Sequence, residues 1–449
     1  MYKQIKLKNG LTLITSPVKG TKTMTVLVIV GTGSKYETRE NNGISHFLEH
    51  MFFKGTVKRP TTLAISGELD SVGAEFNAFT SKEYTGYYVK ADSNKAELAL
   101  DVVSDILLNS KFDAAEIDRE KGVITEEINM YHDNPMMYIE DLFEQVLYGD
   151  TPAGWDTAGT KENVASFERA DFLDYFNSQY QPLNSIICLS GHIDAAMIKK
   201  IERYFSKFAA KHKQKDFQAK PAVKTAQGGP AIKVSYKDTD QAHLSLGVHA
   251  YPYAHKDELS AKLLGIILGG SMSSRLFTEV RERRGLAYYV RTHSEPYTDA
   301  GYVTTQAGVR VDKIEEAIKV ILAEYARLTR ELVPAEELRR VKDLIKGRVV
   351  IQLEASDDVA EWYGRQAVLK LTQQRERNNP PRPADAGHPS KGGEWDRIQT
   401  PEEFFKEVEK VKAEDIRKVA REIFVTSKLN LAVIGPFKDG RSFEKLLKF

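Results

Sequence analysis

The segment GISHFLEHMFFKGT at residues 43–56 predicts a short helix that carries His46, Glu49 and His50 on one face. Side chains three and four positions apart on an α-helix point in the same direction. Two imidazoles can therefore hold one metal ion while the carboxylate lies beside it. The segment indicates a metal site with a general base next to its ligands, and the fold must position this helix.

The pattern His-x-x-Glu-His is the inverted form of the zinc-hydrolase motif. The chain has 10 histidines among 449 residues, and a chain of this composition is expected to match the pattern by chance about 0.02 times. The alternative is a helix whose histidines only pack against the core or face solvent. Chance is the weaker explanation, so we interpret the motif as a zinc site.

A catalytic zinc site usually takes three protein ligands and leaves one position for water. A third ligand must therefore come from another part of the chain. The acidic helical segment DREKGVITEEINMYHDNP at 118–135 offers three candidates, Glu120, Glu126 and Glu127. From the residues alone the choice among them stays open, because most glutamates in such a helix face solvent.

The helix motif HFLEH and the downstream segment REKGVITEEI together resemble the M16 family of zinc metallopeptidases, which includes pitrilysin and the mitochondrial processing peptidase. The resemblance implies that His46, His50 and Glu127 bind one Zn²⁺ ion per chain. It also implies that Glu49 is the catalytic general base. Glu120, about two helical turns before Glu127, matches the glutamate that supports a ligand in this family.

The segment GAEFNAFTSKEYTGYY at 73–88 predicts a strand, a turn and a second strand. Taken alone, it is an ordinary hairpin. In the M16 family, the matching stretch is an edge strand that pairs with the substrate backbone, so the resemblance implies substrate binding by Asn77, Ala78 and Phe79. Such pairing accepts extended peptides with few demands on their sequence.

A third similarity lies in GGSMSSRLFTEVRERRGLAYYV at 269–290. The pattern predicts a helix that ends at Gly285 and a strand that begins with LAYYV. The charges in RERR are usually a solvated cluster. The resemblance instead implies that Arg281 and Tyr288 contact the substrate and help to stabilise the oxyanion.

The two halves of the chain share a pattern at their ends. Residues 170–194 and 413–437 each predict a helix followed by a strand and a glycine, with LNSIICLSG in the first and LNLAVIGP in the second. We infer a duplication. By resemblance, each half is an α+β domain of the α/β-roll type, a mostly antiparallel sheet with helices on one face.

The predicted organisation follows from this duplication and from composition. We expect a zinc-binding catalytic domain at 1–210, a polar linker at 211–229, and a related domain at 230–449 that contributes the Arg and Tyr. Residues 372–397 are rich in Pro, Gly and charge, and we predict a flexible insertion there.

Composition is that of a soluble enzyme. Hydrophobic residues make up 41% of the chain, charged residues 28%, and the net charge is +1, which does not favour binding to nucleic acid or to acidic membranes. No apolar run reaches the roughly 18 residues of a membrane span, and no signal peptide is visible, so we expect a cytoplasmic protein. The single cysteine, Cys188, should be a buried core thiol.

These features predict a zinc endopeptidase that hydrolyses peptides or unfolded polypeptide segments in a closed chamber. Because Tyr288 lies in the second half, we expect a homodimer in which one subunit completes the other's site, or a heterodimer with a related subunit. The alternatives are a noncatalytic or partner-dependent subunit and a structural zinc protein. The first usually lacks part of the motif, and the second usually fills all four coordination positions.

Overall fold

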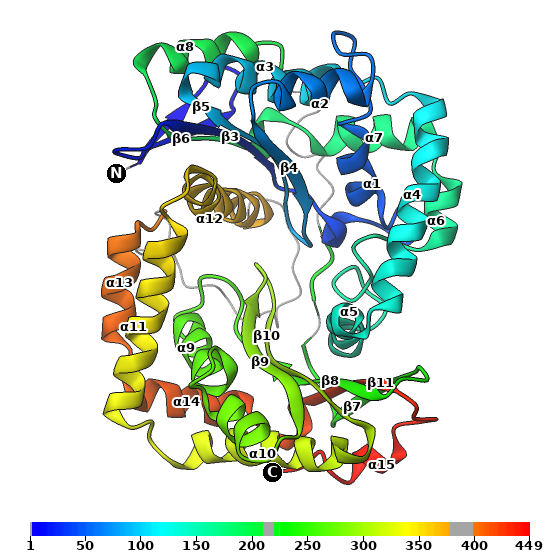
Figure 1. The fold of residues 1–449 in the computed structure, drawn as a ribbon, viewed down its shortest axis with the longest axis vertical. Coiled ribbons are helices and arrows are strands. Elements are labelled where there is room, and N and C mark those ends of the chain that lie inside the picture. The colour runs from blue at the N-terminus through cyan, green and yellow to red at the C-terminus, as the bar shows by residue number, and fades with distance from the viewer. Residues whose placement is uncertain (1, 210–219, 224, 378–397) are drawn as a thin grey trace.

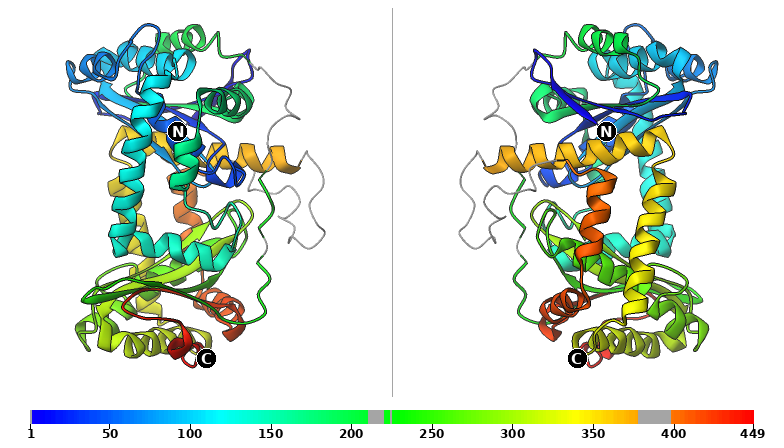
Figure 2. Two further views of the ribbon diagram at one scale, coloured as in Figure 1. Left: turned by 90° about the vertical axis from the view of Figure 1, so that its right-hand side faces the viewer. Right: turned by 90° about the vertical axis from the view of Figure 1, so that its left-hand side faces the viewer.

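The computed structural model describes residues 2–209, 220–223, 225–377 and 398–449. The chain forms two halves, each built on one sheet (Figure 1). Helix α4 (Ala114–Asp133) runs between the halves on one side, and α11 (Ala335–Gln352) and α13 (Pro401–Lys410) run between them on the other (Figures 1 and 2).

The N-terminal sheet has six strands in the order β1-β2-β6-β3-β5-β4. Only β2 and β6 pair in parallel, and all other neighbours are antiparallel. The strands are β1 (Lys3–Lys6), β2 (Thr12–Pro17), β3 (Thr23–Val30), β4 (Glu75–Thr80), β5 (Thr85–Asp92) and β6 (Ser185–Gly191).

The C-terminal sheet repeats this topology without the first strand, in the order β7-β11-β8-β10-β9. Again one pair, β7 and β11, is parallel, and β9 is the edge strand that corresponds to β4. The strands are β7 (Ala231–Tyr236), β8 (Gln241–His249), β9 (Ala287–Pro296), β10 (Gly301–Arg310) and β11 (Leu429–Gly435). The prediction of two related α+β domains with mostly antiparallel sheets is confirmed.

Most helices cover one face of their own sheet. In the first half these are α1 (Ile44–Met51), α2 (Thr62–Asp70), α3 (Ala96–Asn109), α6 (Lys161–Ser166), α7 (Arg169–Gln179) and α8 (Ala195–Tyr204). In the second half they are α9 (Glu258–Gly269), α10 (Ile314–Arg330), α14 (Ala413–Ile423) and α15 (Arg441–Glu444). The predicted helix and strand pairs at the end of each half are present as α7 with β6 and α14 with β11.

Two helices are exchanged between the halves, which the sequence did not predict. Helix α12 (Ser356–Arg377) belongs to the second half but lies on the N-terminal sheet, and α5 (Pro135–Tyr148) lies on the C-terminal sheet (Figure 1). One small core joins Val359, Tyr363 and Val368 of α12 to Ile14, Ile29 and Cys188. The other joins Ile139, Leu142 and Phe143 of α5 to Tyr302, Ala432 and Ile434. Each sheet is therefore covered on both faces, and Cys188 is buried as predicted.

The domain boundaries at 210/211 and 229/230 stay a prediction. Of the predicted linker, residues 211–219 and 224 lie outside the described residues, and the others form neither helix nor strand. Of the predicted insertion at 372–397, residues 372–377 are the end of α12, and residues 378–397 lie outside the described part of the chain.

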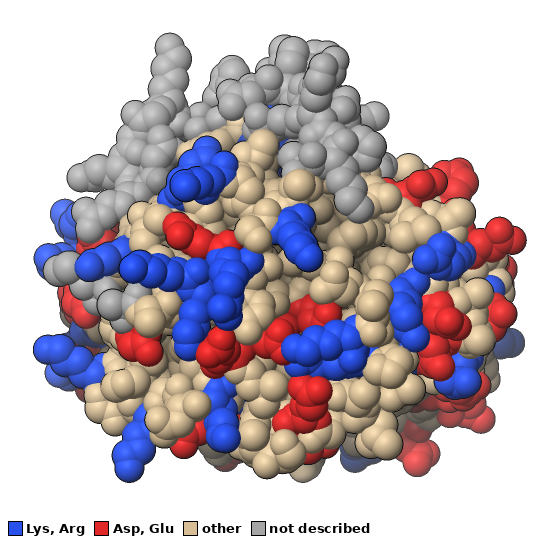
Figure 3. All heavy atoms as spheres, turned by 90° about the horizontal axis from the view of Figure 1, so that it is seen from above, with Lys and Arg blue, Asp and Glu red and all other residues tan. Residues whose placement is uncertain are grey.

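On the face seen from above, Lys or Arg and Asp or Glu side chains lie side by side (Figure 3). Within the described residues, none of the helices has both the length and the apolar character that crossing a membrane requires.

Candidate active site

Helix α1 is the predicted motif helix, and its start is held by a buried carboxylate. Glu37 accepts hydrogen bonds from the backbone N–H of Gly43 (2.8 Å) and of Ser45 (2.8 Å). These donors have no partner inside the helix, so Glu37 satisfies the first turn and complements its positive dipole end. Gly43 itself has a φ of 100°, which favours glycine. The chain therefore enters α1 through one defined turn.

The apolar side of α1 determines where the motif points. Phe47, Leu48 and Met51 are buried in the N-terminal core. His46, Glu49 and His50 lie on the other side and are partly exposed. The predicted one-sided arrangement of the motif is thus confirmed, and its face is turned toward α4.

Helix α4 brings Glu127, one of the three candidate glutamates, to both histidines. Its residues Ile117, Ile124 and Ile128 are buried in the N-terminal core and set the rotation of the helix. As a result Glu127 faces α1, whereas Glu126 is exposed.

The three proposed ligands form one compact group. The Nε2 atom of His46 lies 3.6 Å from Glu127 Oε1, and the Nε2 atom of His50 lies 3.4 Å from Glu127 Oε2. One donor atom of each residue lies within 4.8 Å of the others. Atoms bound tetrahedrally to zinc at about 2.0–2.1 Å are about 3.3–3.4 Å apart. The donor spacing and the donor types, two imidazoles and one carboxylate, therefore fit a zinc ion.

Glu120 determines which nitrogen of His50 is available to a metal. The Nδ1 atom of His50 donates to Glu120 Oε1 at 2.9 Å, and Lys54 Nζ lies 2.6 Å from Glu120 Oε2. When His50 is neutral, as a metal ligand must be, its proton stays on Nδ1 and the lone pair of Nε2 faces the carboxylate of Glu127. Two acceptors facing each other repel, and a cation between them removes that repulsion. The structure therefore supports Glu120 as the residue that orients His50.

The charges of this group shift its pKa values. Burial alone would lower the pKa of His50, but the carboxylates of Glu120 and Glu127 outweigh it and raise the pKa to about 9. His46 and His50 hold the pKa of Glu127 well below its ordinary value. Burial would raise the pKa of Glu120, yet His50 and Lys54 lower it. Both carboxylates are thus ionised at neutral pH and attract a cation.

Glu49 lies on the same helix face but has a different partner. Its Oε2 atom accepts a hydrogen bond of 2.5 Å from the hydroxyl of Thr80, at the end of β4. This bond orients one carboxylate oxygen of Glu49. Neither Thr80 nor Lys54 was predicted from the sequence. Helix periodicity could not identify Lys54, because α1 ends at Met51, and no local pattern links Thr80 to the motif.

The predicted substrate residues lie on the edge strand β4. Asn77, Ala78 and Phe79 pair with Tyr88, Tyr87 and Gly86 of β5. Among the described residues no strand pairs with the outer side of β4. That side has backbone groups available to an added strand, and Thr80 joins the same strand to Glu49.

Arg281 and Tyr288 lie together but apart from the metal-ligand group. The predicted helix before Gly285 is present, wound as a π-helix over Phe277–Glu282, and β9 follows it. The guanidinium of Arg281 lies 5.7 Å from the centre of the Tyr288 ring, and Tyr288 is 77% exposed. Within the described residues, neither side chain has a hydrogen bond, ion pair or ring contact with the histidines, Glu49 or Glu127.

Comparisons with known proteins agree with this geometry. The family model described as Insulinase (Peptidase family M16) matches residues 13–161, and the model described as Peptidase M16 inactive domain matches residues 166–345. An uncharacterized zinc protease of Bacillus subtilis (strain 168), YmxG, is 34% identical over 436 residues, which cover 97% of this chain and 98% of the relative. An uncharacterized zinc protease of Rickettsia felis is also 34% identical, over 98% of both chains.

Solved structures share the fold. A protease from Helicobacter pylori has a TM-score of 0.84 at 21% identity and covers 97% of this chain and 99% of its own. A chain of complex III2 from Candida albicans has a TM-score of 0.77 at 19% identity and covers 100% of both. At these identities the likeness concerns the fold alone.

The duplicated α+β fold and the group of His46, His50 and Glu127 define a two-domain protein with a candidate metal site. The chain belongs to the M16 peptidase family, as the two family models and the relatives named zinc proteases show.

Proposed function

We propose that the chain is a zinc-dependent endopeptidase that hydrolyses peptides or unfolded polypeptide segments in a closed chamber. The observation that carries this proposal is the group of His46, His50 and Glu127, whose donor atoms lie within 4.8 Å of one another. Glu49 lies beside this group and is not one of its ligands, as a general base requires. Relatives along almost the whole chain are named zinc proteases.

In this proposal His46, His50 and Glu127 hold one zinc ion, and Glu120 keeps the proton of His50 on Nδ1. When bound, zinc acts as a Lewis acid that polarises a carbonyl and lowers the pKa of a coordinated water toward about 7. Glu49 takes the proton from the attacking water and passes it to the departing amine. Thr80 holds the Glu49 carboxylate in place through its hydrogen bond.

The edge strand β4 is the proposed binding site for the peptide backbone. A peptide that adds to its outer side would extend the N-terminal sheet and run past Glu49, because Thr80 of β4 contacts that residue. Binding through main-chain hydrogen bonds selects extended segments rather than a particular side chain. Peptides and unfolded segments are therefore the proposed substrates, with Asn77, Ala78 and Phe79 as the pairing residues.

The first test is cleavage of a mixed library of peptides of roughly 10–30 residues, with and without a chelator and with zinc added back. We expect chelator-sensitive cleavage by the wild-type chain. The variant Glu49→Gln should bind zinc normally but lose about 100-fold or more in rate, since it lacks the general base. Retention of more than about a tenth of the wild-type rate would contradict the role of Glu49.

A second copy of the chain is proposed to complete the site. Arg281 and Tyr288 do not contact the metal-ligand group of their own chain in the part that the structure describes, and Tyr288 is 77% exposed. We place this pair over the zinc site of the other subunit of a homodimer, where it would stabilise the oxyanion. A related subunit could occupy the same position in a heterodimer.

Mixing two inactive variants tests this arrangement. Glu49→Gln removes the general base at the zinc site of its own subunit. Tyr288→Phe removes the hydroxyl that its subunit would contribute to the site of the other subunit. A mixed dimer would contain one site with both residues intact, so activity should return when subunits exchange. No recovery, although exchange is demonstrated by labelled subunits, would mean that each site is formed within one chain.

The alternative is a noncatalytic or partner-dependent subunit of an M16-type heterodimer. A chain of complex III2 from Candida albicans shares the fold, so this fold also occurs in a chain of a complex. Against this alternative stands the complete group of ligands and base. Purified protein that binds zinc stoichiometrically but cleaves no peptide in the library would favour the alternative.

A further inference from the structure

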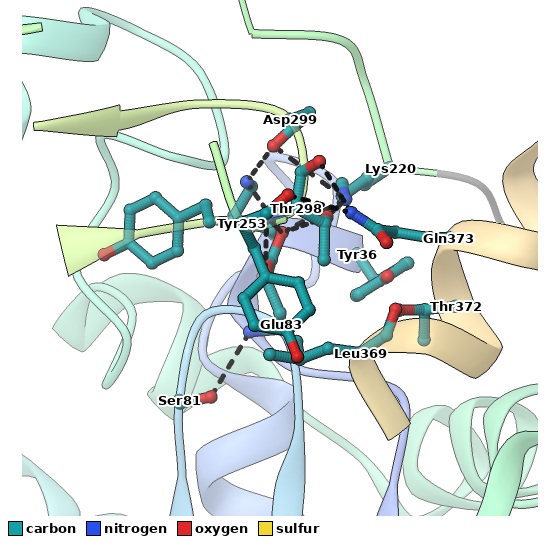
Figure 4. A network of polar contacts seen from close by, with 12 residues as sticks. Tyr36, Ser81, Glu83, Lys220, Tyr253, Thr298, Asp299, Leu369, Thr372 and Gln373 are labelled. Carbon is teal, nitrogen blue, oxygen red and sulfur yellow. Dashed lines mark hydrogen bonds and ion pairs between the residues drawn. The ribbon is translucent and has the colours of Figure 1, made fainter. Parts of the chain in front are cut away.

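A buried group of charged and polar side chains joins the two halves of the molecule (Figure 4). None of these residues is a proposed metal ligand. The group brings together the segment after β3, the turn between β4 and β5, the linker, the turn between β9 and β10, and the end of α12. We call this group the interdomain clasp, and its members are Lys35, Glu83, Lys220, Thr298, Asp299 and Glu376.

Glu83 is the centre of the clasp. Its Oε1 atom lies 3.0 Å from Lys35 Nζ and 3.1 Å from Lys220 Nζ. Thr298 donates to Glu83 through its backbone N–H at 2.9 Å and through its hydroxyl at 2.6 Å. Glu83 thus ties the β4–β5 turn of the first half to the β9–β10 turn of the second half and to the linker.

The other members complete the ionic network. Asp299 lies 2.5 Å from Lys35, and Glu376 lies 3.2 Å from Lys220. The charged side chains are between 1% and 10% exposed. Burial would raise the pKa of Glu83, but Lys220 and Lys35 hold it below the ordinary value, so the carboxylate is ionised.

Such a network is poorly explained by stability alone. Removing charges from water costs free energy that their mutual attraction often only offsets, and apolar side chains can fill the same space at least as well. Ionic contacts differ from apolar ones in being directional, so they favour one arrangement of the segments that they join. The clasp therefore specifies how the two turns and the linker lie relative to one another.

This arrangement reaches the active site through two short connections. The β4–β5 turn that carries Glu83 is continuous with β4, whose Thr80 donates to Glu49. The backbone of the same turn also binds the segment before α1, where Lys35 N–H donates to Lys82 O at 2.9 Å. Two residues after Lys35, Glu37 holds the start of α1.

The backbones of these two segments lie in close contact. A Cβ at Gly33 would lie 2.1 Å from Ser81 O, which is far inside van der Waals contact. This close approach and the hydrogen bond from Lys35 N–H to Lys82 O hold the turn against the segment before α1. A shift of Thr298 in the second half would be passed to β4 through Glu83, whereas α1 is also held by Glu37 and by its buried apolar side.

We propose that Glu83 is a positioning residue for peptide hydrolysis, which through the clasp sets the edge strand β4 relative to Glu49 and to the C-terminal half. The inference rests on the proposed function, since it assigns β4 to substrate binding. Its consequence is that loss of the clasp impairs binding of extended peptides while the metal ligands stay in place.

The variant Glu83→Gln tests this with almost no change of volume. The atoms that contact the Glu83 carboxylate are donors, namely Lys35 Nζ, Lys220 Nζ and the N–H and hydroxyl of Thr298. The amide nitrogen of glutamine would face at least one of these donors, so the clasp loosens. We expect zinc-loaded Glu83→Gln to have a KM for extended peptides about tenfold higher, with a smaller change in kcat.

Amide hydrogen exchange supplies a readout that does not depend on activity. Exchange should accelerate in residues 75–92 and 296–301, while α3 stays protected as in the wild type. Glu97→Gln is the matched control, because Glu97 forms an exposed ion pair with Lys200 in the same half, and it should change neither KM nor exchange.

A milder pair of variants covers the case in which Glu83→Gln does not fold. Thr298→Val removes the hydroxyl that donates to Glu83 and should shift KM and local exchange in the same direction by a smaller factor. Thr298→Ser keeps the hydroxyl and should restore both values.

Wild-type KM together with wild-type exchange in these variants would overturn the proposal. So would faster exchange throughout the chain with an unchanged KM, since that is the behaviour of a group that only stabilises the fold. If the wild-type chain itself cleaves no peptide, the proposed function fails. Faster exchange in the variants that is confined to residues 75–92 and 296–301 would then still support positioning of β4 by the clasp, and faster exchange throughout the chain would contradict it.

Discussion

Glu120 and His50 show at the scale of single residues how a metal ligand is prepared before the metal binds. Glu120 is almost fully buried, accepts from His50 Nδ1 and is paired with Lys54. The hydrogen bond selects the tautomer, and the ion pair keeps the carboxylate charged. Once His50 has lost its second proton, it therefore presents the lone pair of Nε2 toward Glu127 without a change of side-chain position.

The variant Glu120→Gln should weaken zinc binding by about 10- to 100-fold, as loss of a partner behind a ligand typically does. Gln can no longer hold the proton on Nδ1 through a charge-assisted bond, and Lys54 loses its ion pair. Competition with a chelator of known affinity measures the change. Glu126→Gln is the control, because Glu126 is exposed on the same helix. Equal affinity of both variants would refute the orienting role of Glu120.

Zinc binding should release a proton from His50. The carboxylates of Glu120 and Glu127 overcome burial and raise its pKa to about 9 in the metal-free protein, so His50 is protonated at about pH 7.5 and must lose that proton to bind zinc. Apparent zinc affinity should therefore rise with pH until the pKa is passed. Titration calorimetry in two buffers of different ionisation enthalpy counts the protons, and close to one is expected at about pH 7.5.

The same shift acts on the stability of the metal-free protein with the opposite sign. Because the pKa of His50 is raised on folding, its contribution is complete below its unfolded value of 6.5 and is lost as pH rises through about 9. Zinc-free protein should thus lose part of its stability over this interval. A stability that stays constant there, with no proton released on zinc binding, would mean that His50 is neutral without metal.

At the scale of elements, the position of α1 depends on a glycine. Gly43 has a φ of 100°, and a Cβ on it would lie 2.6 Å from Ala158 O. Glu37 accepts from the same residue. Glu37 and Ala158 therefore hold the first turn of the motif helix from two sides. A change at Gly43 would shift this turn and with it His46.

Gly43→Ala should destabilise the zinc-free protein by about 1–3 kcal/mol, the usual cost of a strained backbone conformation. It should also weaken zinc binding, because α1 must shift to relieve the contact with Ala158. Urea unfolding and zinc titration measure the two effects. Gly67→Ala in α2 is the matched control, since a Cβ there meets nothing within 4 Å, and it should be neutral or stabilise by about 0.5–1 kcal/mol. If Gly43→Ala behaves like this control, the entry turn does not position α1.

At the scale of the whole molecule, the exchange of α5 and α12 makes the halves interdependent. Without α12, the N-terminal sheet would expose Ile14, Leu27 and Ile29 to water, and without α5 the C-terminal sheet would expose Ala432 and Ile434. The hydrophobic effect opposes such exposure. We therefore expect the duplication to be one of topology, in which neither half is stable alone.

Residues 1–210 expressed alone should fail to fold into a cooperative, zinc-binding domain. Co-expression with residues 220–449 should restore folding and zinc binding, because α12 then covers the N-terminal sheet. Circular dichroism during thermal unfolding and zinc content of the purified halves measure this. A sharp unfolding transition for residues 1–210 alone, with bound zinc, would show that the exchanged helix is dispensable.

The sequence by itself determined the motif helix, the acidic helix, the β4–β5 hairpin and the repeated helix and strand at the end of each half. These features depend on local periodicity, since residues three or four apart share a helix face and alternate residues share a strand face. Local patterns left the third ligand open among Glu120, Glu126 and Glu127, and the family resemblance pointed to Glu127. The rotation of α4, set by its buried isoleucines, is the physical reason that Glu127 and not Glu126 meets the histidines.

Only the tertiary structure decided the exchange of α5 and α12, the bond from Thr80 to Glu49, and the clasp around Glu83. Each joins residues that are far apart in the chain, such as Glu83 and Thr298, which are separated by 215 positions. A lysine or glutamate that will be buried in such a network has the same local signature as one that faces solvent. The partners become visible only when the two sheets and the exchanged helices bring them together.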